Sequence, residues 1–276
     1  MDKHTEHLHD GWHMEHAVAE QVLEDLAFYR TLIVNVCMIG KANSKDWVLV
    51  DTGISHYGER ILEAAEKRFG KRTPPKAIIL THGHFDHVGS AIYLSKQWDI
   101  PLFVHPGEWD YVIGKRDYPV GDSTVGGGLF SLISPFYPTE GVNLARYVER
   151  LPEDGSLPFL SEWKYIHTPG HTPGHISLFR EKDRTLIAGD AFITVKQESS
   201  FAVFTQHQKV HGPPAYFTPN WEEAEKSVKK LADLNPSLAL TGHGLPMEGA
   251  ILQKQLRELA DNFREMAIPK HKRKPH

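Results

Sequence analysis

The chain has 276 residues, 40% of them hydrophobic, which suffices for one large domain or two small ones with a sizeable core. Its formal net charge of -4 at pH 7 argues against a general attraction to nucleic acid or anionic membranes. The single cysteine, Cys37, excludes an intramolecular disulfide framework and is expected to be an inert buried thiol.

No apolar run reaches the about 20 residues that a membrane-spanning helix needs. The N-terminus lacks a basic stretch followed by an apolar one, the pattern of a secretory signal. We therefore expect a cytoplasmic protein without membrane or nucleic-acid partners. The first sixteen residues carry five histidines and are expected to form a surface extension: His4, His7, His9, His13 and His16.

The first half of the chain predicts strands at 32–39 and 47–50, the second of which ends in Asp51-Thr52-Gly53. A helix is expected over 58–69, where apolar residues recur at helical spacing. The apolar run 77–80 then reads as a short buried strand, which delivers the next residues to its C-terminal end.

Those next residues form the most informative stretch of the chain, His82-Gly83-His84-Phe85-Asp86-His87. Neutral imidazole and carboxylate are ligands that suit zinc, iron or manganese. Four such groups on one turn would repel one another or stay unsatisfied without a cation. A polar surface turn is the alternative, and the matching groups further along the chain count against it.

Between the two halves, a helix is expected over 90–98 and a strand over 102–105. The segment 106–158 is rich in glycine, proline and aromatic residues. It predicts an insertion, which would supply either an apolar substrate wall or an oligomer interface or second core. A homodimer is compatible with the second interpretation.

The second half repeats the order strand, Asp, helix, strand, His, which indicates an internal duplication. Here the Asp is Asp190, the helix spans 221–234 and the His is His243. Both halves place these side chains at strand ends, where ligand-binding loops gather in α/β folds. A further helix is expected over 249–266. The strands of this half are expected at 163–167, 176–179, 185–188 and 238–240.

A second histidine motif precedes Asp190, with the sequence Thr168-Pro169-Gly170-His171-Thr172-Pro173-Gly174-His175. Its two Pro-Gly pairs predict turns, so His171 is expected on a rigid loop. Gly189-Asp190 and Gly242-His243-Gly244 are each more typical of a plain turn. Together with the first motif, and in this order, they predict a metal constellation.

This constellation resembles that of the metallo-β-lactamase superfamily. The resemblance implies an α/β fold, an αββα four-layer sandwich of two sheets with helices outside. From composition and pattern we expect an N-terminal extension over 1–20, one domain over 21–268 with the insertion 106–158, and a basic tail over 269–276.

The resemblance also implies a ligand set for two divalent metals, with zinc preferred and iron or manganese as alternatives. The family pattern points to His171 rather than His175, and Asp51 would orient ligands unless it is a turn residue. The first metal would be held by His82, His84 and His171, the second by Asp86, His87 and His243, and Asp190 would bridge them.

Two such cations about 3.5–4 Å apart share a water and lower its pKa, which yields a hydroxide able to attack a carbonyl or phosphorus. Asp86 and Asp190 are the candidate catalytic carboxylates, able to accept a proton and pass it on. No serine or cysteine nucleophile is suggested, since the chain has no Gly-x-Ser-x-Gly elbow.

Members of the superfamily catalyse many reactions. Two differences between this chain and particular branches narrow the choice of reaction. His84 stands where flavodiiron oxygen reductases carry Glu. Ala191-Phe192-Ile193-Thr194 follows Asp190, where glyoxalase II members carry a Gly-Cys-Gly-Arg-Phe-like run. We expect a small-molecule ester, lactone or thioester substrate. The alternatives are an iron-dependent sulfur dioxygenase with a single iron and a metal-binding module without activity.

Overall fold

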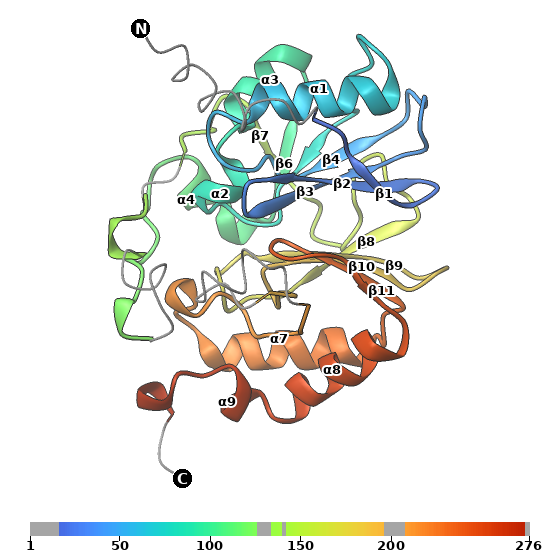
Figure 1. Ribbon diagram of the computed structural model, residues 1–276. Coiled ribbons are helices and arrows are strands. Elements are labelled where there is room, and N and C mark those ends of the chain that lie inside the picture. Colours follow the sequence, from blue (N-terminus) through green and yellow to red (C-terminus); the bar gives the residue numbers. More distant parts are fainter. Residues whose placement is uncertain (1–16, 126–133, 140–141, 196–207, 274–276) are drawn as a thin grey trace, which may run out of the picture.

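The computed structural model describes residues 17–125, 134–139, 142–195 and 208–273. The five N-terminal histidines lie outside these ranges. Two sheets lie face to face between two layers of helices (Figure 1). Helices α1 (Gly58–Phe69) and α3 (Ala91–Trp98) cover the outer face of the first sheet. Helices α7 (Trp221–Asp233) and α8 (Gly249–Asp261) cover the outer face of the second. The expected αββα sandwich is confirmed.

The first sheet has seven strands in the order β1-β2-β3-β4-β5-β6-β7. Its first four strands are antiparallel, and β4 to β7 are parallel, so the parallel strands end at one edge. The strands are β1 (Glu20–Leu23), β2 (Leu26–Thr31), β3 (Val34–Ile39), β4 (Val48–Val50), β5 (Ile78–Ile79), β6 (Leu102–Val104) and β7 (Val148–Arg150).

The second sheet has five strands in the order β12-β11-β10-β9-β8. Strands β10 and β11 are parallel, and the other pairs are antiparallel. This sheet thus repeats the parallel strand pair that β4 and β5 form in the first. The strands are β8 (Trp163–His167), β9 (Ile176–Arg180), β10 (Thr185–Gly189), β11 (Leu238–Thr241) and β12 (Met247–Glu248).

The core between the two sheets is apolar. Phe28 and Ile79 of the first sheet share one buried cluster with Leu178 and Leu240 of the second. Burying this surface stabilises the pairing by roughly 25 cal/mol per Å². Cys37 lies in the same cluster, and burial raises the pKa of its thiol, which fits the expected inert core residue.

Two sequence expectations need correction. The strand expected over 32–39 begins at Val34, because Leu32 has a φ of 67° and turns the chain between β2 and β3. The helix expected over 249–266 is two helices, α8 and α9 (Phe263–Met266), interrupted at Asn262. Among the described residues, no helix combines the length and the apolar character that a membrane crossing requires.

Candidate metal centre

Strand ends from both sheets meet at this centre. Asp51 directly follows β4, and the histidine motif follows β5 after Leu80 and Thr81. Asp190 directly follows β10, and His243 lies two residues after β11. The parallel pairing of β4 with β5 and of β10 with β11 brings these residues to the same ends of their sheets.

The structure brings the seven predicted side chains together in three overlapping groups, each with its candidate ligand atoms within 4.8 Å of one another. All seven side chains belong to buried residues, none more than 7% exposed. His175, although buried, is in none of these groups. The groups are His82, His84 and His171; His82, His87 and Asp190; and Asp86, His87 and His243.

In the first group, Nδ1 of His84 lies 2.9 Å from Nε2 of His171. Two threonine hydroxyls face the remaining ring nitrogens: that of Thr81 lies 3.0 Å from Nδ1 of His82, and that of Thr218 lies 3.3 Å from Nδ1 of His171. These hydroxyls hold the two rings with Nε2 directed toward the group. Nε2 of His82 is buried and has no hydrogen-bond partner in the described part of the chain.

Asp51 orients the second group, as the sequence indicated. Its Oδ2 lies 2.8 Å from Nδ1 of His87, which leaves Nε2 of that ring for the centre. The same carboxylate accepts hydrogen bonds from the backbone N–H of Thr81 at 2.7 Å and from its hydroxyl at 2.8 Å. Asp51 is therefore fixed by the strand end that carries the first histidine motif.

His243 follows a strand of the second sheet and is held in place by residues of the first sheet. Its Nδ1 donates to the backbone carbonyl of Ile33 at 2.8 Å, in the turn between β2 and β3. The Asn35 amide donates to the carbonyls of Thr241 and Gly244, at 2.9 and 2.6 Å. Nε2 of His243 thus faces inward, 3.5 Å from Oδ2 of Asp86.

Asp190 lies between the groups. Its Oδ2 is 3.2 Å from Nε2 of His243, 3.4 Å from Nε2 of His171 and 3.6 Å from Nε2 of His87. Its Oδ1 is buried without a hydrogen-bond partner. One carboxylate therefore contacts ring nitrogens from both the first and the last of the three groups.

The charges of the centre follow from burial and from these contacts. Burial, reinforced by the neighbouring imidazoles, lowers the pKa of His84 to about 3 and holds the pKa of His82 and His171 well below 6.5. Burial alone would raise the pKa of Asp190, but His243 and His87 outweigh it and hold that pKa well below its usual range. The first group is therefore neutral and the Asp190 carboxylate is charged.

This donor set fits a divalent metal. Neutral imidazoles with carboxylates are ligands for zinc, iron and manganese. Buried polar atoms normally have hydrogen-bond partners, yet Nε2 of His82, Nε2 of His87 and Oδ1 of Asp190 have none among the residues that the structure describes. All three atoms belong to the middle group, where a cation would satisfy them.

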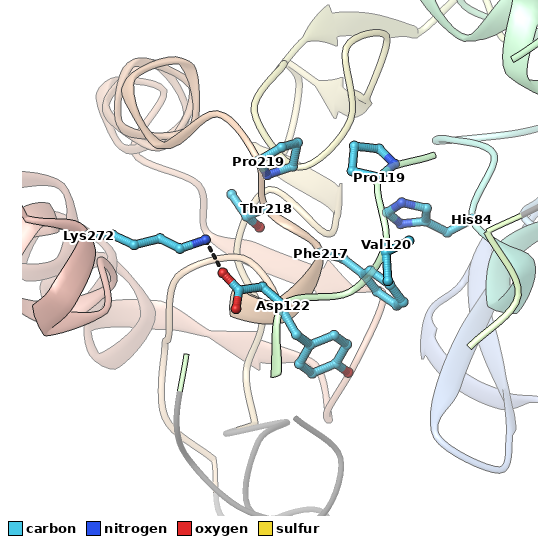
Figure 2. A pocket seen from close by; sticks show the side chains of 9 residues that line it. His84, Pro119, Val120, Asp122, Phe217, Thr218, Pro219 and Lys272 are labelled. Atoms are coloured by element: carbon cyan, nitrogen blue, oxygen red, sulfur yellow. Dashed lines mark ion pairs between the residues drawn. The ribbon is translucent and has the colours of Figure 1, made fainter. Parts of the chain in front are cut away.

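A pocket of about 390 Å³ opens beside His84 (Figure 2). The segment 106–158 supplies Pro119, Val120 and Asp122 to its wall, so this part of the expected insertion faces the centre. The segment 216–219 supplies Tyr216, Phe217, Thr218 and Pro219.

The end of the pocket away from His84 carries an ion pair between Asp122 and Lys272 (Figure 2). Lys272 belongs to the basic tail expected over 269–276. The ring of His84 packs against Tyr118 and Phe217, with ring centres 4.6 and 5.0 Å apart. The pocket thus runs from a candidate metal ligand along an aromatic wall to a charged end.

Known proteins similar to this chain show the family to which it belongs. The family model described as the metallo-beta-lactamase superfamily matches residues 29–243. The probable metallo-hydrolase YflN of Bacillus subtilis is 50% identical over 217 residues, which cover 79% of this chain and 82% of that protein. The probable metallo-hydrolase YybB of the same organism is 33% identical and covers 72% of this chain and 76% of its own length.

Solved structures share the fold at low sequence identity. A beta-lactamase from Chitinophaga pinensis aligns with a TM-score of 0.60 and 16% identity, over 96% of this chain and 97% of that chain. The di-iron-bound form of TTHA1623 aligns with a TM-score of 0.55 and 22% identity, over 82% of this chain and 95% of that chain.

Proposed function

Since the chain belongs to the metallo-beta-lactamase superfamily, we propose that it is a dinuclear metal-dependent hydrolase of a small-molecule ester, lactone or thioester. The observation that carries the proposal is the position of Asp190, whose Oδ2 lies 3.2–3.6 Å from ring nitrogens of both ligand groups. A carboxylate in that position can bridge two cations.

In this proposal, His82, His84 and His171 would hold one metal, Asp86, His87 and His243 would hold the other, and Asp190 would be a ligand to both. When bound, the pair supplies an activated water and a Lewis acid for the substrate oxygen. Zinc is preferred by the donor set. Iron and manganese accept the same ligands, and the structural neighbour TTHA1623 is described with two irons.

The chain itself supplies the proton-transfer groups. Asp86 and Asp190 are the carboxylates of the three ligand groups. They are therefore the candidates to accept a proton during attack on the carbonyl and to return it to the leaving group. Asp51 makes hydrogen bonds to Thr81 and His87, so its role is to orient His87 rather than to transfer a proton.

The pocket favours an uncharged carbonyl substrate. Val120, Phe217 and the neighbouring prolines form an apolar wall beside His84. The cation of this pocket, Lys272, is already paired with Asp122. Phosphodiester recognition generally uses arginine or lysine clamps near the metals. An acyl chain or a lactone ring against the aromatic wall would instead gain about 25 cal/mol of binding free energy per Å² of buried apolar surface.

The group formed by Asp86, His87 and His243 supports the hydrolase over the sulfur dioxygenase. A single iron would use only His82, His84, His171 and Asp190 as protein ligands. A single iron would give no role to the hydrogen bonds that orient His87 and His243, made with Asp51 and with the carbonyl of Ile33. Two metals give both arrangements a function.

A substrate panel tests the proposal. Lactones, aryl esters, thioesters, phosphodiesters and β-lactams are assayed with the zinc, manganese and iron forms, and the metal-depleted protein serves as the control. We expect a lactone or ester to have the highest kcat/KM. A phosphodiester preference in every metal form would overturn the substrate class. One iron per chain with thiol-dependent oxygen uptake would replace the hydrolase by the dioxygenase.

A further inference from the structure

Glu108, like Asp51, is a buried carboxylate beside the centre that is in none of the three ligand groups. Glu108 is fully buried and ends the short turn Pro106–Glu108 that follows β6. Its carboxylate accepts hydrogen bonds from the backbone N–H of Gly174 at 2.6 Å and from that of Gly83 at 3.1 Å. It also accepts a hydrogen bond from the hydroxyl of Tyr118.

All three donors are close to histidines of the first group, two of them along the chain and one through a ring contact. Gly83 lies between His82 and His84 in the chain, in the loop after β5 of the first sheet. Gly174 lies in the loop that carries His171, between β8 and β9 of the second sheet. The ring of Tyr118 packs against His84 with centres 4.6 Å apart. One carboxylate therefore connects two ligand loops from different sheets and the aromatic ring beside one ligand.

The two glycines make this close approach feasible. A Cβ at Gly174 would overlap the backbone of Gly107 and Glu108. A Cβ at Gly83 would overlap the hydroxyl of Tyr118 and a methyl group of Val112. Only glycine at these positions lets the carboxylate reach both backbone N–H groups, so the packing and the hydrogen bonds belong to one arrangement.

We propose that Glu108 is a positioning residue that sets the separation between the His82–His84 loop and the His171 loop, and thereby the metal affinity of that three-histidine group. The inference rests on the proposed function only insofar as these histidines bind a metal. Nδ1 of His84 and Nε2 of His171 come from opposite sheets, and one cation must reach both. Two donors to the Glu108 carboxylate belong to these two loops, so this one side chain links them directly.

The test is Glu108→Gln, which keeps the size of the side chain and replaces one acceptor oxygen by an NH₂ donor. Because one carboxylate oxygen accepts from Gly174 and the other from Gly83, the NH₂ group faces one of these backbone N–H groups in either orientation, and the connection between the loops weakens. Removing such supporting contacts typically reduces metal affinity about 10–100-fold. We expect a loss of that size for one of the two zinc equivalents, measured by competition with a chromophoric chelator.

The matched control is Glu149→Gln, an exposed glutamate on β7, which should leave both zinc affinities unchanged. Thermal unfolding of the metal-free proteins checks that each variant folds. The visible spectrum of the protein with one equivalent of cobalt gives a second readout, because it reports ligand geometry directly. We expect a changed spectrum in Glu108→Gln and the wild-type spectrum in Glu149→Gln.

Tyr118→Phe is the second variant, and it keeps the ring against His84 while removing one donor to Glu108. We expect a smaller loss of zinc affinity than in Glu108→Gln. Wild-type affinity for both equivalents in folded Glu108→Gln would overturn the inference. If that variant does not fold, wild-type affinity in Tyr118→Phe would overturn it instead.

None of these measurements uses a substrate. Absence of hydrolysis by the zinc-loaded wild type would therefore refute the proposed function and leave the role of Glu108 standing. Unchanged zinc affinity in the variants would refute the role of Glu108 and leave the proposed function standing.

Discussion

The backbone N–H of Asp190 donates a hydrogen bond to Nε2 of His175 at 2.9 Å. Nδ1 of the same ring lies 2.9 Å from the hydroxyl of Thr168. Burial lowers the pKa of His175 to about 3, so the ring is neutral and carries its proton on Nδ1. Both nitrogens are therefore used within the protein, which favours His171 over His175 as the ligand. His175 instead fixes the end of β10, which Asp190 directly follows.

We expect His175→Leu to weaken metal binding about 10–100-fold, the range for residues that orient ligands. The substitution removes the acceptor for the Asp190 N–H and leaves that buried group without a partner. His175→Gln, whose side-chain oxygen can accept the same hydrogen bond, should recover part of the affinity. Chelator competition with zinc measures both variants, and equal losses in Leu and Gln would contradict the role assigned to this hydrogen bond.

Asp190→Asn tests the bridging position itself. The amide keeps the shape but removes the negative charge that faces Nε2 of His87, His171 and His243. We expect a folded protein with reduced metal content and a loss of hydrolysis of at least about 100-fold, the upper end of the range for orienting residues. Metal analysis and turnover of the best substrate are measured together. Wild-type metal content with wild-type turnover would exclude the bridging role.

Most of the fold could be predicted because its elements carry strong local patterns. The helix expected over 58–69 is found over the same residues, since its apolar side chains recur at helical spacing and Pro74-Pro75 follows. Strand β1 was not predicted, because Glu20–Leu23 is a sheet edge whose residues are exposed or half-buried. The break at Asn262 was not predicted either, because Phe263 continues the apolar spacing of α8.

The candidate site could be predicted to the extent that its residues are close in sequence or follow a strand. The histidine motif is dense enough to recognise, and Asp190 and His243 occupy equivalent strand ends. Glu108 could not be found in this way, because its partners Gly83 and Gly174 are 25 and 66 residues away along the chain. Nothing in the sequence Pro106-Gly107-Glu108 distinguishes it from a solvated turn.

The pH dependence of stability offers a test away from the ligands. Burial, and then the charge of His167, lowers the pKa of His105 to about 4, below the value of about 6.5 in an unfolded chain. The unfolded state therefore binds more protons between these pH values. Stability is lost as the pH falls from about 6.5 toward 4.

We expect His105→Asn to reduce the slope of the unfolding free energy against pH in this window, by at most one proton. Urea unfolding of the metal-free proteins at several pH values measures the slopes. Equal slopes in wild type and His105→Asn would show that His105 does not titrate as the structure indicates.

The charged end of the pocket is formed where the basic tail meets the segment 122–124. Lys272 pairs with Asp122, and His271 lies within hydrogen-bond distance of Thr124, 3.1 Å from its hydroxyl, so the tail lies against the segment 122–124. Burial would raise the pKa of Asp122, but the hydrogen bonds from Lys272 and Thr124 outweigh it and lower that pKa to about 2. The stabilisation from this carboxylate is therefore present above about pH 3.9 and is lost as the pH falls through 2.

We expect Lys272→Met to raise KM by up to about 5-fold without changing metal content, because a partly exposed ion pair contributes at most about 1 kcal/mol. The effect should be constant between pH 5 and 9, where Asp122 stays charged. It should shrink at 1 M salt, where the screening length falls to about 3 Å. Lys270→Met, at an exposed position of the same turn, is the control. A loss of metal in Lys272→Met, or a KM equal to that of the control, would mean that the ion pair does not shape the substrate pocket.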